Sequence, residues 1–127
     1  MENTAIHTEN APAAIGPYSQ AVKSGNMIFV SGQLGLVPAS GNFPSDDIRD
    51  QTRQSLTNIK SILETAGFSM KDVVKTTVLL KDIAQFGDMN EVYKEFFAEP
   101  FPARAAFQAA ALPKGGLVEI EAIACRA

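Results

Sequence analysis

The sequence contains one cysteine and one histidine, and it has no tryptophan. A single cysteine cannot form an internal disulfide, so Cys125 favours a reducing, cytoplasmic compartment. Zinc sites need several Cys or His ligands at set spacings, so we expect no metal. A Ser–His or Cys–His nucleophile pair would have to use His7, for which a surface or strand-pairing role is the simpler interpretation. Acid–base chemistry therefore falls to a carboxylate, a tyrosine or a lysine.

Long apolar runs and an excess of basic residues are also missing. Residues 1–8 are polar, and no apolar run approaches the length of a membrane span, so we expect neither a signal peptide nor a membrane anchor. The 11 Lys and Arg residues against 14 Asp and Glu give a net charge of −3, which disfavours nucleic acid as a partner. With 127 residues, 46% of them hydrophobic, the chain is predicted to form one domain over residues 1–127.

Apolar periodicity predicts two helices and six strands. The first helix runs from an N-cap at Ser45 to a glycine stop at Gly67. The second covers Ile83–Phe97 and opens at a capping box of Asp82 and Gln85. The strands are expected at Asn3–Thr8, Gln20–Ser24, Met27–Leu34, Val73–Leu80, Ala103–Ala110 and Leu117–Cys125. This order favours an α+β fold with both helices on one face of a mixed sheet.

Each predicted strand has two faces, because side chains alternate along it. We expect the helices to cover the apolar faces, which include Gly32 and, in the last two strands, Ala103, Ala105, Phe107 and Ala109, then Val118, Ile120, Ala122 and Ala124. The opposite, mixed faces carry the polar residues Ser31, Gln33, Arg104, Gln108, Glu119 and Glu121. Such faces predict a second buried layer supplied by another subunit. The pattern fits a buried ion-pair network and an active site equally well.

Five blocks of sequence carry a more specific signal. In chain order they are NAPAAIGPYSQAV (10–22), VSGQ (30–33), VVKTTVLLKD (73–82), FPARAAF (101–107) and LPKGGLVEIEAIA (112–124). Together they span almost the whole chain, and they resemble the Rid family, the reactive intermediate deaminases of the YjgF type. The RidA subfamily is the nearest match.

The resemblance implies a chorismate-mutase-like α+β fold and a homotrimer with sites between subunits. It also implies hydrolytic deamination of 2-enamino and 2-imino acids, namely 2-aminocrotonate/2-iminobutanoate and 2-aminoacrylate/2-iminopropanoate. Pyridoxal-phosphate enzymes such as the threonine and serine dehydratases release these compounds, which gives a functional link to them. The products are 2-oxo acids and ammonia, and no cofactor is expected.

The resemblance also assigns roles to residues. Arg104 matches the arginine that binds the substrate carboxylate, and Glu119 matches the acid that activates water. Other expected substrate-binding positions are Tyr18, Ser31, Gly32, Asn90, Ala105 and Ala106. Many bacterial members have cysteine where this chain has Ala106, but active members with alanine at this position are also familiar. The alanine therefore argues against thiol chemistry and not against deamination. Cys125 is interpreted as a packed strand residue.

Two other functions remain open at this stage. A small-carboxylate-binding regulatory module could use the same pocket, but it would not need an acid that activates water. An RNA-directed activity, either translation inhibition or a ribonuclease, has also been attached to the family. The acidic composition and the single histidine disfavour the RNA-directed activity.

Overall fold

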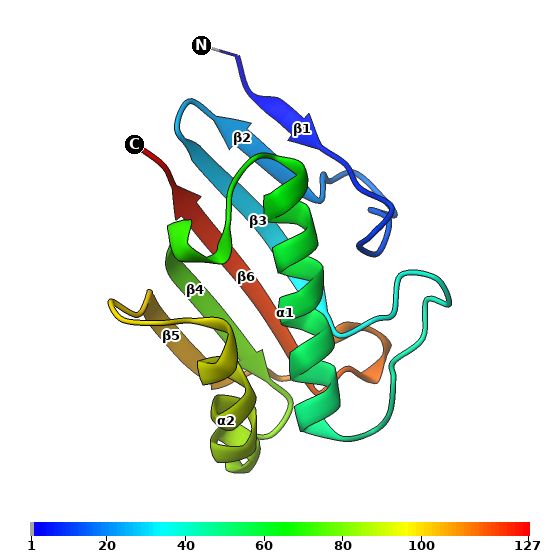
Figure 1. Cartoon of the computed structure of the whole chain (residues 1–127). Coiled ribbons are helices and arrows are strands. Elements are labelled where there is room, and N and C mark those ends of the chain that lie inside the picture. The colour runs from blue at the N-terminus through cyan, green and yellow to red at the C-terminus, as the bar shows by residue number, and fades with distance from the viewer. Residues whose placement is uncertain (1) are drawn as a thin grey trace.

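The computed structural model describes residues 2–127 (Figure 1). The strands are β1 (Thr4–Ile6), β2 (Ala21–Ser24), β3 (Met27–Leu34), β4 (Val73–Leu80), β5 (Ala103–Gln108) and β6 (Val118–Cys125). The helices are α1 (Ile48–Thr65) and α2 (Phe86–Phe96), with short 3₁₀ turns at Met70–Asp72, Ile83–Gln85 and Pro113–Gly115. The six strands form one sheet in the order β1-β2-β3-β6-β4-β5, in which only the β4–β5 pair is parallel. These elements confirm the predicted α+β fold with a mixed sheet.

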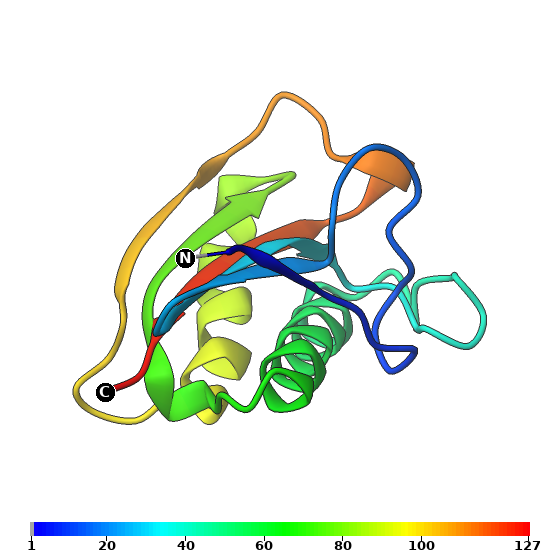
Figure 2. The same cartoon turned by 90° about the horizontal axis from the view of Figure 1, so that it is seen from above.

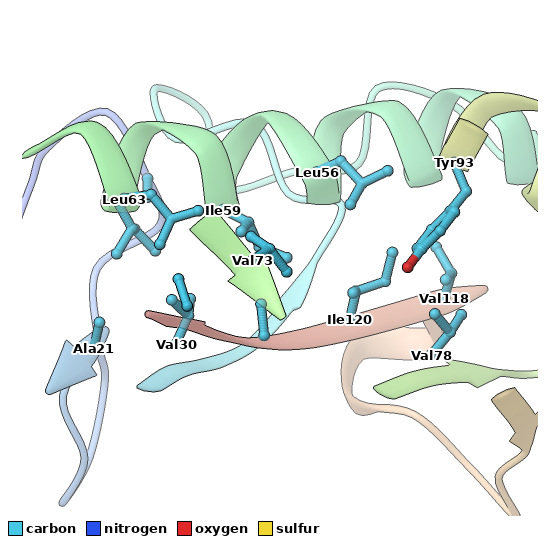
Figure 3. Packing of buried hydrophobic residues seen from close by; sticks show 14 of the residues in the cluster. Ala21, Val30, Leu56, Ile59, Leu63, Val73, Val78, Tyr93, Val118 and Ile120 are labelled. Atoms are coloured by element: carbon cyan, nitrogen blue, oxygen red, sulfur yellow. The ribbon is translucent and has the colours of Figure 1, made fainter. Parts of the chain in front are cut away.

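Both helices pack on the same face of the sheet, as the view from above makes plain (Figure 2). The core lies between the two layers, where Leu56, Ile59 and Leu63 of α1 are fully buried. Figure 3 shows them above the sheet, with Val118 and Ile120 of β6 below. Burial of side chains this size stabilises the fold by about 1.5–3 kcal/mol each. The other face of the sheet has no helix over it.

The turns and helix ends mostly follow the predicted signals. Gly25, in the tight β2–β3 turn, has a φ of 63°, and Gly67 after α1 has a φ of 85°, which suits glycine at both places. The N-cap of α1 is Asp47 rather than Ser45, because the Asp47 carboxylate accepts from the Arg49 amide at 2.7 Å. The Ser45 hydroxyl instead accepts from the amide of Asp47, two residues further on.

The second predicted helix is split into two pieces. Asp82 caps a 3₁₀ turn by accepting from the Ala84 amide at 2.9 Å, and α2 then begins at Phe86. The interval that the sequence assigned to one helix is therefore a 3₁₀ turn followed by an α-helix. No helix among residues 2–127 is long and apolar enough to cross a membrane.

The predicted faces are wrong in two places. In β5, Phe107 is 50% exposed on the open side of the sheet, while Ala106 packs against the core. Arg104 therefore lies on the helix side, opposite to the prediction. In β3, two residues lie between Val30 and Gln33, whereas only one residue of β6 lies between their partners, and this bulge moves Gly32 out of the apolar face. Gln33 is buried in its place.

A row of buried polar side chains on α1 holds the end of β3. The Ser55 hydroxyl donates to the Gln33 carbonyl at 2.7 Å. The Asn58 amide donates to the carbonyls of Leu34 and Leu36 at 3.3 and 2.9 Å. These bonds satisfy backbone carbonyls that leave the sheet inside the protein, where an unpaired group is costly.

Gln51 extends this row to the start of β6. Its side chain accepts from the Leu117 amide at 2.9 Å and donates to the Ser45 carbonyl at 2.9 Å. The helix passes so close at this point that a Cβ on Gly35 would lie 2.2 Å from the Gln51 carbonyl oxygen. Gly35 is therefore required for α1 to sit against the strand ends.

The Asn58→Ala substitution tests the buried polar row. It removes the donor to two buried carbonyls, so we expect the free energy of unfolding to fall by about 2–4 kcal/mol in urea denaturation. The control is Thr57→Ala, which removes an exposed hydroxyl that bonds only the Arg53 carbonyl. We expect the control to change stability by less than about 0.5 kcal/mol. Equal losses in the two variants would contradict the role given to Asn58.

Candidate functional site

Arg104 lies beside α2 with its guanidinium on the surface. Its Nη1 donates to the Asn90 Oδ1 at 2.7 Å. Its Cζ lies 4.7 Å from the ring centre of Tyr93 and 5.2 Å from that of Phe86. These are cation–π distances, which favour a guanidinium lying over the ring faces. Arg104 makes no salt bridge to an acid of the described residues, which leaves its charge free for an anion.

An open cavity of about 380 Å³ adjoins Arg104. It is lined by Asn90, Tyr93, Lys94, Phe101, Pro102 and Arg104. The combination of a planar cation, a second cation and aromatic walls suits a small, flat anion. We define these six residues as the arginine half-site.

Glu119 lies in a different cavity, on the open side of the sheet. This cavity has a volume of about 410 Å³ and brings Glu119 together with Tyr18, Gly32 and Lys114. The rest of its wall is largely apolar: Pro12, Ala13, Ile15, Leu34, Leu36 and Pro113. We define this cavity as the glutamate half-site. Tyr18 is 53% exposed and Ile15 81% exposed, so large apolar side chains stand at its rim without a covering partner in the chain.

The carboxyl group of Glu119 sits directly over Gly32. A Cβ at Gly32 would lie 3.0 Å from the Glu119 Cδ and 3.1 Å from its Oε2. The bulge in β3 turns Gly32 to this side, so the bulge and the absence of a side chain together make room for the carboxyl group.

The environment of Glu119 changes its acidity. Burial, followed by the nearby charge of Glu121, raises the pKa of Glu119 above its ordinary value. A carboxyl group with a raised pKa is a better proton acceptor once ionised, and it can also return the proton. Groups with such shifts concentrate at functional sites, which makes Glu119 a candidate acid–base group.

The remaining predicted positions divide between the two sides of the sheet. The Ser31 hydroxyl donates to the Ser19 carbonyl at 2.6 Å, so it holds the segment that leads into β2. Ala105 pairs with Thr77, which itself pairs with Glu121, and these three residues share the open side. Ala106 is on the helix side with Arg104. Asn90 contacts Arg104, a role that the sequence alone did not predict.

Arg104 and Glu119 do not meet within one chain. Glu119 pairs with Leu79, which pairs with Phe107, so Arg104 lies two strands across and three residues along from Glu119. Strand spacings of about 4.8 Å and rises of about 3.3 Å put their Cα atoms roughly 14 Å apart. Their side chains also point to opposite faces of the sheet. The expectation that Ser31, Arg104 and Glu119 share one face is therefore wrong.

A third cavity, larger than these two, lies elsewhere. It has a volume of about 830 Å³, lies where α1 and α2 end, and contains neither Arg104 nor Glu119. Its charged walls mix lysines with glutamates, including Lys60, Lys71, Glu64 and Glu95. Such a mixture defines no preference for one charge of ligand. Within residues 2–127, no three His, Cys, Asp or Glu side chains are grouped so that they could hold a metal ion.

Sequence reasoning missed the aromatic support of Arg104. Phe86 and Tyr93 supply this support, and Tyr93 also belongs to the hydrophobic core. A signal was present, because Phe86, Asn90 and Tyr93 are spaced four and three residues apart and so share one face of a helix. The missing information was that Arg104 faces α2.

Comparison with known proteins identifies the family to which this chain belongs. Residues 8–126 match the family described as Endoribonuclease L-PSP, and the chain belongs to that family. The predicted Rid-type resemblance is confirmed by relatives such as the 2-iminobutanoate/2-iminopropanoate deaminase of Bos taurus. That protein is 58% identical over 119 residues, which cover 94% of this chain and 87% of the relative.

Solved structures agree with this assignment. RidA from a Psychrobacter species superimposes with a TM-score of 0.93 at 50% identity, covering 97% of this chain and 99% of that one. Escherichia coli TdcF, crystallised with bound serine, gives a TM-score of 0.93 at 47% identity, covering 98% and 99%. The predicted fold is confirmed by these neighbours.

The Gly32→Ala substitution tests whether Gly32 makes room for the Glu119 carboxyl group. The new methyl group meets the carboxyl group at about 3.0 Å, so we expect Glu119 to move toward solvent and its pKa to fall toward the ordinary value. Titration of the Glu119 side-chain carbon by NMR measures this change. Gly87→Ala is the control, since a Cβ there meets nothing within 4 Å. An unchanged Glu119 titration in Gly32→Ala would contradict the role given to Gly32.

Glu119→Gln tests the raised pKa through stability. The folded state holds the Glu119 proton more tightly than the unfolded state. The proton on Glu119 therefore contributes to the free energy of unfolding of the wild type. This contribution is fully present below the unfolded-state pKa of about 4.3 and is lost as the pH rises through the folded-state pKa. The melting temperature of Glu119→Gln should rise relative to that of the wild type as the pH increases from about 4 through the folded-state pKa of Glu119. Glu9→Gln serves as a surface control. A difference that stays constant with pH would contradict the shift.

Proposed function

We propose that this chain is an enamine/imine deaminase that hydrolyses 2-iminobutanoate and 2-iminopropanoate to 2-oxo acids and ammonia. One observation carries the proposal: two reactive groups lie at open cavities in a chain that is 58% identical to a 2-iminobutanoate/2-iminopropanoate deaminase. Arg104, which makes no salt bridge to a described residue, adjoins one cavity, and Glu119, whose pKa is raised, lies in another. These are the two groups that hydrolysis of a small, flat 2-imino acid requires. The enamines 2-aminocrotonate and 2-aminoacrylate enter as imines after protonation at C3.

Arg104 binds the substrate carboxylate. A guanidinium has five N–H donors, and Asn90 takes one of them. The remaining donors can form two parallel bonds to a carboxylate, a geometry that lysine cannot supply. Binding at one end of so small a molecule fixes the position of C2, the carbon that water must attack. The serine bound to Escherichia coli TdcF supports a ligand of this size and type.

Glu119 handles the protons. Its carboxylate accepts a proton from water as the oxygen adds to C2 of the protonated imine, which gives a neutral carbinolamine. The same carboxyl group then returns that proton to the nitrogen, and the C–N bond breaks as ammonia leaves. The carbinolamine hydroxyl gives up its proton to the carboxylate as the C=O bond of the 2-oxo acid forms, and ammonia takes up this proton. Water and imine are thus fully accounted for in the products. A raised pKa suits both steps, because general acid–base catalysis is most effective when the pKa approaches the working pH.

The complete site lies between subunits of a homotrimer. The arginine and glutamate half-sites are on opposite faces of the sheet, so one chain cannot bring both to the same substrate. The uncovered face carries Phe29 and Phe107, which are 44% and 50% exposed, together with Ile123 between Phe29 and Lys75 in the sheet. A second copy that covers this face would join its Arg104 to the Glu119 already there.

The reaction needs a supplier, because free 2-imino acids are short-lived in water. Pyridoxal-phosphate dehydratases that eliminate water from threonine or serine release compounds of this class. Tyr18, Ser31, Gly32, Asn90, Ala105 and Ala106 are proposed to shape the substrate pocket, as the family resemblance implies. For Ser31 and Asn90, the contacts described above favour support of the pocket over direct binding.

A carboxylate sensor and an RNA-directed activity are less well supported. A sensor would need Arg104 but would gain nothing from a half-buried acid whose ionisation costs stability. RNA binding is favoured by an excess of basic side chains, whereas this chain has 14 Asp and Glu against 11 Lys and Arg. Arg49 is paired with Asp88 and Glu91, and Arg53 with Glu95, at 2.7–2.9 Å. The proposed hydrolysis uses both half-sites.

Arg104→Ala and Glu119→Gln together test the activity and the shared site. Purified protein is added to a threonine dehydratase reaction, and the loss of the imine is followed with the release of ammonia. Each variant alone should lose about 10²-fold or more of kcat/KM, through lost positioning or lost proton transfer. Arg53→Ala, which removes a surface ion pair away from both half-sites, is the control and should keep wild-type turnover.

Mixing the two inactive variants gives the sharper result. When they are unfolded together and refolded in equal amounts, about one interface in four of a cyclic trimer joins an intact Arg104 to an intact Glu119. Turnover should therefore recover to about a quarter of wild type. A mixture that stays inactive would place both residues in one chain's site, and wild-type turnover by either single variant would rule out its role.

A further inference from the structure

The face of α2 toward Arg104 forms a shaped support. Phe86, Asn90 and Tyr93 occur at spacings of four and three residues, so they form one stripe along the helix. All three contact the Arg104 guanidinium, two through ring faces at 5.2 and 4.7 Å and one through a hydrogen bond of 2.7 Å. Arg104 itself comes from β5, the edge strand of the sheet. An exposed arginine on an edge strand thus has three partners from a single helix.

Tyr93 is the most firmly held member of this stripe. It is 4% exposed, and its hydroxyl shares a hydrogen bond of 2.7 Å with the Thr76 hydroxyl. Thr76 is the residue of β4 that pairs with Arg104 in the sheet. The ring of Phe97 packs against the Tyr93 ring, tilted by 40°, with ring centres 4.7 Å apart. The ring that lies under Arg104 therefore has its plane set by the core.

A long exposed side chain normally samples many rotamers, and fixing it when a ligand binds costs free energy. Stacking over two rings and one hydrogen bond restrict Arg104 before any ligand arrives. The Arg104 Cζ lies over both rings, while a carboxylate bonds to the N–H groups of a guanidinium, so support and binding do not compete. The arrangement holds the guanidinium plane fixed with its free N–H groups at the cavity.

We propose that Phe86 and Tyr93 are positioning residues for carboxylate binding, which act by stacking against Arg104 and fixing the plane of its guanidinium. This rests on the proposed function, in which Arg104 binds the substrate carboxylate. Neither ring needs to touch the substrate. The two rings raise the affinity for the carboxylate, because they reduce the free-energy cost of ordering Arg104. Their effect on the proton transfers at Glu119 is smaller.

The alternative is that Tyr93 serves only the core. Packing alone predicts that loss of the ring lowers stability and changes affinity only as far as the fold is damaged. Stacking predicts that affinity falls when the aromatic ring is removed and is kept when a ring remains, whatever the stability of the variant. The two are separated by comparing Tyr93→Leu and Tyr93→Phe with Val92→Ala, which truncates a neighbouring buried side chain of α2.

The experiment titrates each oligomeric variant with 2-oxobutanoate, the product acid, by calorimetry, and measures kcat, KM and melting temperature. We expect Tyr93→Leu to raise Kd and KM about 3- to 30-fold, the range of a cation–π contact. The change in kcat should be smaller than the change in KM. Tyr93→Phe should restore most of the affinity although it loses the bond to Thr76. Val92→Ala should lower the melting temperature and keep the wild-type Kd.

Phe86→Leu repeats the test at the outer ring, which is only partly buried, so it remains decisive where Tyr93→Leu does not fold. It should raise Kd several-fold at nearly wild-type melting temperature. Wild-type Kd in folded Tyr93→Leu or in Phe86→Leu would overturn the positioning role. Arg104→Ala is measured alongside: if it also keeps wild-type Kd, then Arg104 does not bind the carboxylate, and the proposed function fails first.

Discussion

The alternation of side chains across a single sheet is the constraint on which the rest of the structure depends. One helix layer covers one face, so every strand divides its residues between a dry core and an open side. Arg104 falls on the helix side of β5 and Glu119 on the open side of β6. Under the proposed function, a reaction that uses both groups needs a second chain, so the proposal makes association part of the chemistry.

Each half-site depends on the layer behind it. Arg104 packs against Tyr93 of α2, and Tyr93 is hydrogen-bonded to Thr76 of the sheet. Glu119 lies over a glycine in the β3 bulge, and the start of its strand is held by the buried Gln51 of α1. The two helices thus do more than cover the core, because one supports the cation and the other anchors the strand that carries the acid. Burial of Glu119 on one side then raises its pKa.

Much of the fold followed from the sequence, because apolar periodicity and glycine turns are local signals. The strand Val73–Leu80 and the β2–β3 turn at Gly25 were predicted where they occur. Face assignments failed where the signal was ambiguous. Both faces of β5 contain alanine, and its one large apolar residue, Phe107, lies on the open face, so composition assigned the wrong face to the helices. The bulge in β3 also has no local signature beyond Gly32. The roles of Arg104 and Glu119 came from the family resemblance, and their separation came only from the sheet register.

A crystal structure of the wild-type oligomer with 2-oxobutanoate tests the shared site most directly. We expect the ligand carboxylate to form two hydrogen bonds, of about 2.7–2.9 Å, with the Arg104 guanidinium of one subunit. A water molecule held by Glu119 of the neighbouring subunit should lie next to C2 of the same ligand. A ligand that contacts Arg104 and Glu119 of one chain, or one whose carboxylate lies away from Arg104, would contradict the shared site.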